Sequence, residues 1–232
     1  RRVLFRSPNT YLYLRFIYLL LGIISISCTE SNHSDSSHPL IIKVQLPNQI
    51  SDDPTWTALQ YAVDDLEYAT QAISGADQLV GSQQKVDTDI QVVLDSTLSQ
   101  VVGIEGYILN HDDSKVTVKA STPIGAAYGL YHIAGDLGAR YFHPEEQRFP
   151  LNKSLTVPRY QSLIVQPRFM RRGFHEHTQH PIVMSEYLLK SNVDGYRDKV
   201  SRYLRWLLRN RQNTLSFHML NTVSLDQWVP YM

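Results

Sequence analysis

The sequence predicts an α/β protein, in which a small mixed-sheet domain is followed by the beginning of a second α/β domain. Between Leu40 and Gln166, β-branched runs alternate with two long amphipathic helical patterns. Each of these helical patterns begins at a capping residue followed by proline, the usual start of a helix. Residues 167–232 then read as strand, helix and strand, and they contain four of the nine histidines, three of them within six residues.

The composition is that of an ordinary globular protein and excludes some function classes. The 232 residues contain 22 Lys and Arg against 22 Asp and Glu, so there is no basic excess to favour a nucleic-acid partner. The single cysteine, Cys28, excludes an internal disulfide framework and an all-cysteine zinc site. No Walker loop or dinucleotide fingerprint is present, and we expect no cofactor.

The first 39 residues are typical of an export signal and a tether. An apolar run at Phe16–Ile26 follows Arg15 and is shorter than the roughly 20 residues of a membrane span. It ends just before Cys28, which resembles the lipidated cysteine of a bacterial lipoprotein signal; a plain cleaved signal is the alternative. Residues 29–39 are polar and predict a flexible tether. We therefore expect residues 1–28 to be a leader and lipoprotein signal, and the protein to be held at the bacterial cell envelope by a lipid anchor.

The first domain, residues 40–166, is expected to contain strand, helix and three further strands before its second helix. The predicted strands are 40–46, 89–94, 105–110 and 115–120, the last two forming a hairpin. The first helix begins at Asp53-Pro54 and ends at Gly75. The order β-α-β-β-β-α-β predicts a mixed sheet covered by two helices.

The second helix of this domain begins at Thr122-Pro123 and ends at Gly138, a residue suited to a helix C-terminus. Gly125 and Gly129 lie one turn apart on it, and each costs helix stability of about 1 kcal/mol relative to alanine. Close approach of the helix to the sheet would explain them. Short strands are expected at 140–143 and 154–157.

The second domain begins with a cluster of histidines. His175 and His177 lie two residues apart on a predicted strand, so both point to one face while Glu176 points to the other. His180 follows closely. A helix at 195–210 comes next, with an apolar side that includes Leu204 and with arginines that we expect to form a solvated face, at Arg197, Arg202, Arg205 and Arg209. Residues 213–220 predict a buried parallel strand.

Two motifs resemble a known group of enzymes. Residues 122–131 (TPIGAAYGLY) and 137–142 (LGARYF) are similar to the N-terminal accessory domain of α-glucuronidases and family 20 β-hexosaminidases, and to uncharacterised bacterial relatives. In these families a segment like residues 167–173 (PRFMRRG) opens the first strand of a (β/α)8 barrel. The resemblance implies an accessory domain at 40–166 and, at 167–232, the first one and a half units of a truncated barrel, since a full barrel needs about 250 residues.

The resemblance also implies where a substrate would bind. Active sites of such barrels lie at the carboxyl ends of the strands. We expect substrate-binding residues at Arg172, His175, His177, His218 and Asn221. By resemblance, Arg172 hydrogen-bonds sugar hydroxyls, and the catalytic acidic pair lies on a fourth strand beyond residue 232. The fragment alone is therefore expected to be inactive.

Three functions fit these patterns. The first is a cell-envelope glycoside hydrolase-like protein acting on an oligosaccharide or polysaccharide. The second is a metal-dependent hydrolase, because His175 and His177 suit two imidazole ligands of one zinc ion. The third is a surface lipoprotein that binds glycans without catalysis.

Overall fold

The structure is a computed structural model that describes residues 41–47, 53–74, 86–112, 115–151, 158–177, 183–190 and 192–218. The chain divides into two compact units, Arg1–Ser36 and Ser37–Met232, and all described residues belong to the second. The predicted leader with Cys28, the tether, the strand at 154–157, His180 and Asn221 lie outside the described residues. Within the described part, no helix is both long and apolar enough to span a membrane.

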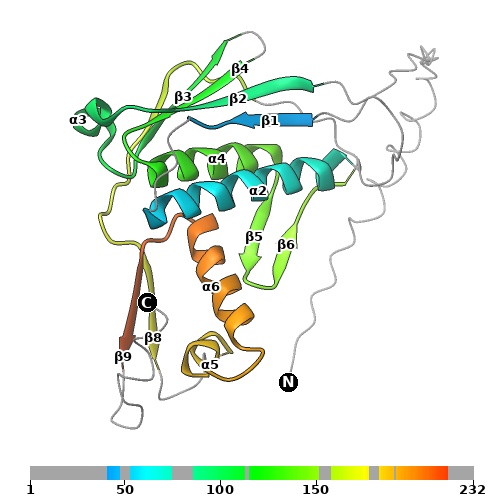
Figure 1. Ribbon diagram of the computed structural model, residues 1–232, viewed down its shortest axis with the longest axis vertical. Coiled ribbons are helices and arrows are strands. Elements are labelled where there is room, and N and C mark those ends of the chain that lie inside the picture. Colours follow the sequence, from blue (N-terminus) through cyan, green and yellow to red (C-terminus); the bar gives the residue numbers. More distant parts are fainter. Residues whose placement is uncertain are drawn as a thin grey trace, which may run out of the picture. The chain divides into compact units, whose positions relative to one another are not determined.

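A five-stranded mixed sheet forms the centre of residues 41–166, which are called the N-terminal domain below after the predicted boundary (Figure 1). Its strands, in spatial order, are β1 (Ile41–Gln45), β2 (Val86–Leu94), β4 (Lys115–Ala120), β3 (Tyr107–Asp112) and β7 (Leu163–Val165). The first three are parallel, whereas β3 runs antiparallel to both of its neighbours. The predicted hairpin and mixed sheet are confirmed.

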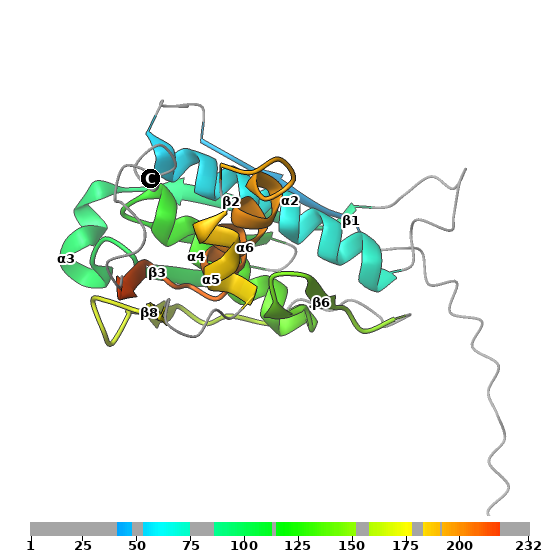
Figure 2. The same cartoon turned by 90° about the horizontal axis from the view of Figure 1, so that it is seen from below.

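Two helices, α2 (Pro54–Ser74) and α4 (Pro123–Leu137), pack against each other and cover one face of this sheet (Figures 1 and 2). Both begin as predicted. The Asp53 carboxylate accepts a hydrogen bond from the Thr55 amide at 2.9 Å, and the Thr122 hydroxyl accepts one from the Gly125 amide at 3.2 Å. Gly138 ends α4 with a φ of 108°, in the region that glycine adopts without strain.

The predicted close approach of α4 to the sheet is confirmed at Gly129. A Cβ atom at this position would lie 2.6 Å from Cγ1 of Val118 on β4. Gly125 is similarly close to the loop before β3, where a Cβ atom would lie 2.6 Å from the Gly106 carbonyl oxygen. The two glycines therefore lose helix propensity but allow the helix backbone to lie directly on its neighbours.

The strand after α4 does not join the central sheet, contrary to the predicted order. β5 (Arg140–His143) pairs with β6 (Glu146–Arg148) in a separate two-stranded sheet, and the fifth strand of the central sheet is β7. The physical reason lies in Tyr141, the buried residue of β5, whose ring packs edge-on against Tyr131 and Phe149. Short helices at η2 (Ser96–Leu98), α3 (Ser99–Val102) and α5 (Val183–Leu189) were not predicted.

The C-terminal part forms the predicted strand, helix and strand. β8 (Gly173–His177) and β9 (Thr214–His218) are parallel, and α6 (Arg197–Arg209) connects them. Helix α6 buries Val200, Tyr203, Trp206 and Leu207, while Leu204, expected on the apolar side, is 43% exposed. This arrangement is one and a half β/α units; closure into a barrel stays a prediction.

The arginines of α6 do not all form a solvated face, which corrects the sequence prediction. Arg205 and Arg209 both bind Asp65, a buried residue of α2, with shortest N–O distances of 2.6 and 2.7 Å. Tyr131 of α4 donates a further hydrogen bond to the same carboxylate at 2.9 Å. The prediction failed because the side of α6 that carries Arg205 and Arg209 packs against α2. The pattern of a single helix does not reveal such a contact.

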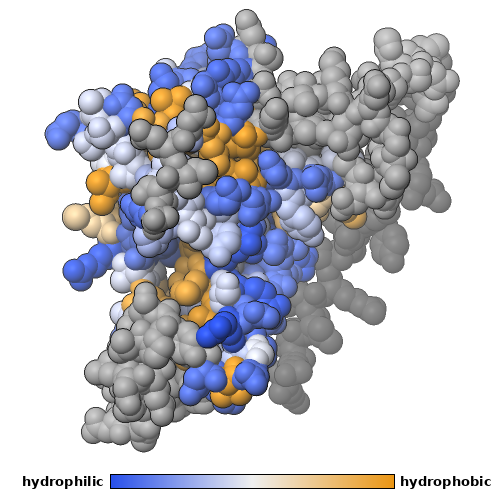
Figure 3. Space-filling view, in the orientation of Figure 1, coloured by the Kyte–Doolittle hydropathy of each residue, from blue (hydrophilic) through white to orange (hydrophobic). Residues whose placement is uncertain are grey.

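The described surface in the view of Figure 3 is mostly hydrophilic, and its hydrophobic residues form separate patches. Exposed apolar side chains such as Ile104, Phe142 and Met170 belong to different loops and strands. Scattered exposure of this kind is normal for globular proteins. On this face, therefore, the described residues do not form one continuous apolar docking strip.

Candidate functional site

The side chains of β8 alternate between two environments. Phe174 and Glu176 face α6, where the Phe174 ring stacks on Trp206 at a centroid distance of 5.3 Å. His175 is exposed on the opposite face, and its Nδ1 lies 3.0 Å from Oγ of Ser216 on β9. The strand therefore has a helix side and an open side, and His175 belongs to the open side.

The register of β8 on β9 pairs the predicted histidines. Gly173 is opposite Thr214, His175 is opposite Ser216, and His177 is opposite His218. His177 and His218 are thus neighbours at the carboxyl ends of the two parallel strands. In a parallel β/α arrangement this end carries the binding residues. Asn221, which was expected beside them, lies outside the described residues.

Glu176 is a buried carboxylate on the helix side of β8. Its exposure is 2%, and it accepts a hydrogen bond from the Tyr203 hydroxyl. Its other oxygen, Oε2, has no hydrogen-bond partner among the described residues. Burial raises the pKa of Tyr203, and the Glu176 carboxylate raises it further, so this hydroxyl remains a proton donor. Because Glu176 points away from His175, it is not placed to act as an acid on the histidine face.

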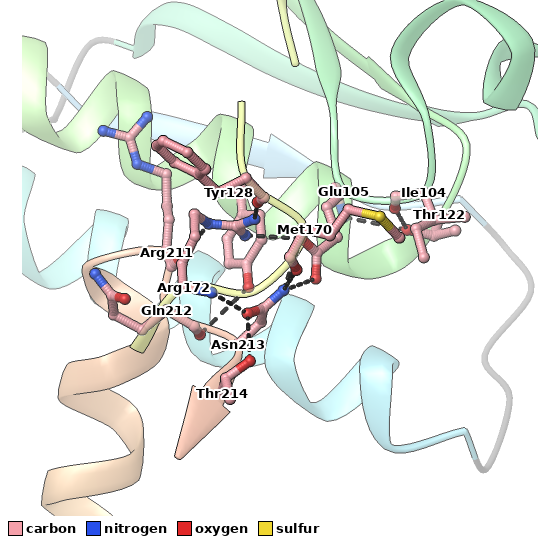
Figure 4. A network of polar contacts seen from close by, with 12 residues as sticks. Ile104, Glu105, Thr122, Tyr128, Met170, Arg172, Arg211, Gln212, Asn213 and Thr214 are labelled. Atoms are coloured by element: carbon pink, nitrogen blue, oxygen red, sulfur yellow. Dashed lines mark hydrogen bonds and ion pairs between the residues drawn. The ribbon is translucent and has the colours of Figure 1, made fainter. Parts of the chain in front are cut away.

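Arg172 lies at the opposite end of β8 from His177. The two residues are five positions apart along extended chain, which is about 16 Å at a rise of about 3.3 Å per residue. Its Nη2 pairs with the Glu105 carboxylate at 2.7 Å, Nη1 donates to the Phe169 carbonyl at 2.7 Å, and Nε donates to the Arg211 carbonyl at 2.9 Å (Figure 4). All three guanidinium nitrogens therefore already have protein partners.

Asn213 and Glu105 complete this network at the amino end of the strands. The Asn213 amide nitrogen Nδ2 donates to both oxygens of Glu105, at 2.9 and 3.1 Å, and to the Met170 carbonyl at 2.8 Å. Its Oδ1 accepts from the Arg172 backbone amide at 2.9 Å. Figure 4 shows these side chains converging between the N-terminal domain and the start of β9.

A cavity of about 240 Å³ lies beside this network. Its lining includes Tyr107 and Tyr128 from the N-terminal domain, and Arg172 and Arg211 from the C-terminal part. Burial raises the pKa of Tyr128 to about 12, with the nearby Glu105 charge acting in the same direction and Arg172 opposing it. This cavity is at the amino end of β8, so it is separate from the carboxyl ends where His177 and His218 lie.

Among the described residues, no three His, Cys, Asp or Glu side chains cluster as metal ligands do. The metal-binding alternative stays a prediction. Sequence reasoning missed Glu105, Asn213 and Ser216. Ser216 could have been found, because it lies two residues before His218 on the predicted strand and so shares its face. Glu105 offered no signal beyond being an acidic residue in a loop before a strand.

Comparisons with known proteins identify the fold at low sequence identity. No protein-family profile and no curated protein sequence matches this chain. Among solved structures, it is similar to a family GH115 4-O-methyl-α-glucuronidase with specificity for decorated arabinogalactans, with a TM-score of 0.51, 18% identity, and coverage of 77% of this chain and 25% of that one.

Two further structures cover similar shares of the chain. A GH138 enzyme targeting pectin rhamnogalacturonan II has a TM-score of 0.47 and 14% identity, covering 82% of this chain and 22% of the other. The GH20 β-N-acetylhexosaminidase from Streptomyces coelicolor A3(2) has a TM-score of 0.44 and 16% identity, covering 77% and 30%. The chain spans between about a fifth and a third of the length of these three structures. The likeness to the glucuronidase shows a glycosidase-like fold in the described part.

Proposed function

We propose that this chain is the N-terminal part of a glycoside hydrolase-like protein that acts on glycans. The observation that carries the proposal is the parallel pair β8 and β9, which presents His175 and Ser216 on an open face and brings His177 and His218 into register at the carboxyl ends. The glycosidase-like fold of the described residues supports the same class.

In this proposal the histidines bind sugar hydroxyls, and the bond-breaking groups come from elsewhere in a longer protein. A neutral imidazole both donates and accepts hydrogen bonds, which suits hydroxyl groups. Hydrolysis needs two carboxylates flanking the bond, or one carboxylate with a substrate acetamido group. Glu176 cannot be one of them from the helix side of β8, so the proposed catalytic acids lie on later strands, and the 232-residue chain should not turn over glycosides by itself.

The test uses the complete reading frame from the native host and a panel of aryl-glycosides and oligosaccharides. We expect glycan binding or hydrolysis that falls at least about tenfold in His175→Ala and His218→Ala, the scale of one lost hydrogen bond to a substrate. The matched control is His143→Ala, on β5 of the N-terminal domain, which should leave activity unchanged. Unaltered activity in folded His175→Ala and His218→Ala would contradict the assignment.

The same experiment separates the alternatives. Binding without hydrolysis by the complete protein would identify a glycan-binding relative. Stoichiometric zinc that is lost in His175→Ala would instead identify a metal-dependent hydrolase.

We also propose that the protein is anchored to the bacterial envelope through lipid on Cys28. The support is the short apolar run before this cysteine and the polar tether after it. In the native host, Cys28→Ser should move the protein from the membrane fraction to the soluble fraction. Retention in the membrane fraction after this change would contradict the anchor.

A further inference from the structure

The Glu105 carboxylate contacts the starting points of the two parallel strands β8 and β9. The residue lies in the loop between α3 and β3, in the N-terminal domain. It pairs with Arg172 at 2.7 Å and accepts two hydrogen bonds from Asn213 at 2.9 and 3.1 Å. Arg172 directly precedes β8, and Asn213 directly precedes β9. The side chain therefore contacts both strands at the position where each begins.

The two starting points are also linked to each other. The backbone amides of Asn213 and Thr214 both donate to the Arg172 carbonyl, at 2.8 and 3.0 Å, while the Arg172 amide donates to Asn213 Oδ1 at 2.9 Å. The strands are so close here that a Cβ atom on Gly173 would lie 1.5 Å from the Thr214 carbonyl oxygen. These contacts fix the position of β8 relative to β9.

The loop that carries Glu105 is itself tightly held. A Cβ atom on Gly106 would lie 2.1 Å from the Val102 carbonyl oxygen, so only glycine fits the path from α3 into β3. The Thr122 hydroxyl donates to the Ile104 carbonyl, which ties the same loop to the start of α4. The Glu105 and Arg172 side chains are only 16% and 18% exposed, so solvent screens their attraction incompletely.

Register matters at this place because side chains alternate along a strand. A shift of one residue moves every side chain to the other face. In the observed register His175 and Ser216 share the open face, and Phe174 and Glu176 face α6. A slip of β8 by one residue would turn His175 toward α6 and bring Glu176 to the open face.

We propose that Glu105 is a positioning residue, which sets the register of β8 on β9 through Arg172 and Asn213 and so aligns the histidine face. In this proposal Arg172 holds the start of β8 through its ion pair with Glu105. It does not make the direct sugar contact that is expected from the resemblance. The register claim concerns the strands alone; only its relevance to glycans rests on the proposed function.

Disulfide trapping tests this claim without any sugar. In a Cys28→Ser background, the pair His175→Cys and Ser216→Cys reports the observed register, and the pair His175→Cys and Leu215→Cys reports a one-residue slip. Opposed residues on paired strands are close enough for a disulfide. With Glu105 present, we expect the first pair to oxidise at least about tenfold faster than the second.

Glu105→Ala should remove most of this preference, lowering the ratio of the two oxidation rates at least about fivefold. The control is Glu146→Ala, which should leave the ratio unchanged, because its carboxylate pairs with the exposed Arg148 on β6, in a different sheet from β8. An unchanged ratio in Glu105→Ala would overturn the proposal. If this variant does not fold, Glu105→Gln replaces it. The glutamine side chain can still accept a hydrogen bond from Asn213 but has no charge to pair with Arg172. A lowered ratio of oxidation rates then supports the claim, and an unchanged ratio rejects it. Because no glycan is present, failure here leaves the glycan proposal standing, and failure of the glycan assay leaves the register claim standing.

Discussion

Replacing Asp65 with alanine removes the carboxylate that joins α2 to α6. The residue is 4% exposed, and it accepts hydrogen bonds from Arg205, Arg209 and Tyr131. Arg209 is also buried, with 7% of its side chain exposed, whereas 28% of the Arg205 side chain is exposed. The substitution therefore removes the anion from two guanidinium groups, that of Arg209, which is buried, and that of Arg205, which is partly exposed.

The magnitude follows from that unpaired charge. Breaking a buried ion pair by removing one partner costs about 3–5 kcal/mol, because the remaining charge stays desolvated. The exposed fraction of Arg205 favours the lower half of this range, about 3–4 kcal/mol, since that side chain can turn to solvent. For a protein of about 150–250 residues, 1 kcal/mol corresponds to about 2–4 °C in Tm. We thus expect Asp65→Ala to lower the Tm by about 6–16 °C.

Urea denaturation and thermal melting measure this effect, with Asp64→Ala as the matched control. Asp64 precedes Asp65 on the same helix but is exposed, so its loss should change the free energy of unfolding by less than about 0.5 kcal/mol. If both variants unfold within about 1 kcal/mol of each other, the reasoning about the buried pair is refuted. A double-mutant cycle with Arg209→Met then measures the coupling directly.

The pH dependence gives an independent check on the same carboxylate. Burial alone would raise the pKa of Asp65, but the hydrogen bonds from Arg209 and Arg205 outweigh it and hold the pKa below the usual 3.8. A lowered pKa in the folded state stabilises the protein at pH values above the unfolded pKa. The stability difference between wild type and Asp65→Ala should be constant from neutral pH to about pH 5 and should shrink as acid protonates the carboxylate, below about pH 4.

Three other predictions follow from the N-terminal domain. Gly129→Ala should lower the free energy of unfolding, because overpacking against Val118 costs about 1–3 kcal/mol. Gly135→Ala, with no atom within 4 Å of the added Cβ, should instead raise the free energy of unfolding by up to about 1 kcal/mol. Equal effects of the two changes in urea denaturation would contradict the packing argument. Thr122→Ala should cost about 0.5–2 kcal/mol by the same measurement, and Thr122→Ser should restore most of it, since serine also caps helices. Burial lowers the pKa of His132, so the unfolded chain binds more protons below about pH 6.5 and stability should rise with pH in that window; a His132→Phe variant with an equally steep pH profile would refute this.

The two long helices and the hairpin of the N-terminal domain were predictable because their signals are local. Asp53, Thr122 and Gly138 each mark a helix end through contacts within three or four residues, and the structure confirms all three. The alternation of β3 and β4 is equally local. These features depend on neighbouring residues that the sequence displays directly.

The contacts that place the candidate site were not predictable in the same way. Arg205 and Arg209 looked solvated because their partner, Asp65, lies 140 or more residues earlier in the chain. Glu105 is separated from Asn213 by 108 residues, and an isolated acidic residue in a loop carries no sign of its partner. The destination of β5 also depended on tertiary packing, through the rings around Tyr141. By contrast, the face of His175 followed from strand alternation alone.

The packing of helix α6 on α2 limits where this protein can be joined to parts of other proteins in a chimaera. Tyr203, Trp206 and Leu207 belong to the same apolar cluster as Leu59 and Leu66 of α2, so one core includes residues on both sides of the domain boundary predicted at residue 167. A chimaera that joined residues up to Pro167 to a foreign C-terminal part would lack α6. It would expose the apolar cluster and leave Asp65 without Arg205 and Arg209. Viable exchanges would have to carry α2 and α6 together, as a matched pair.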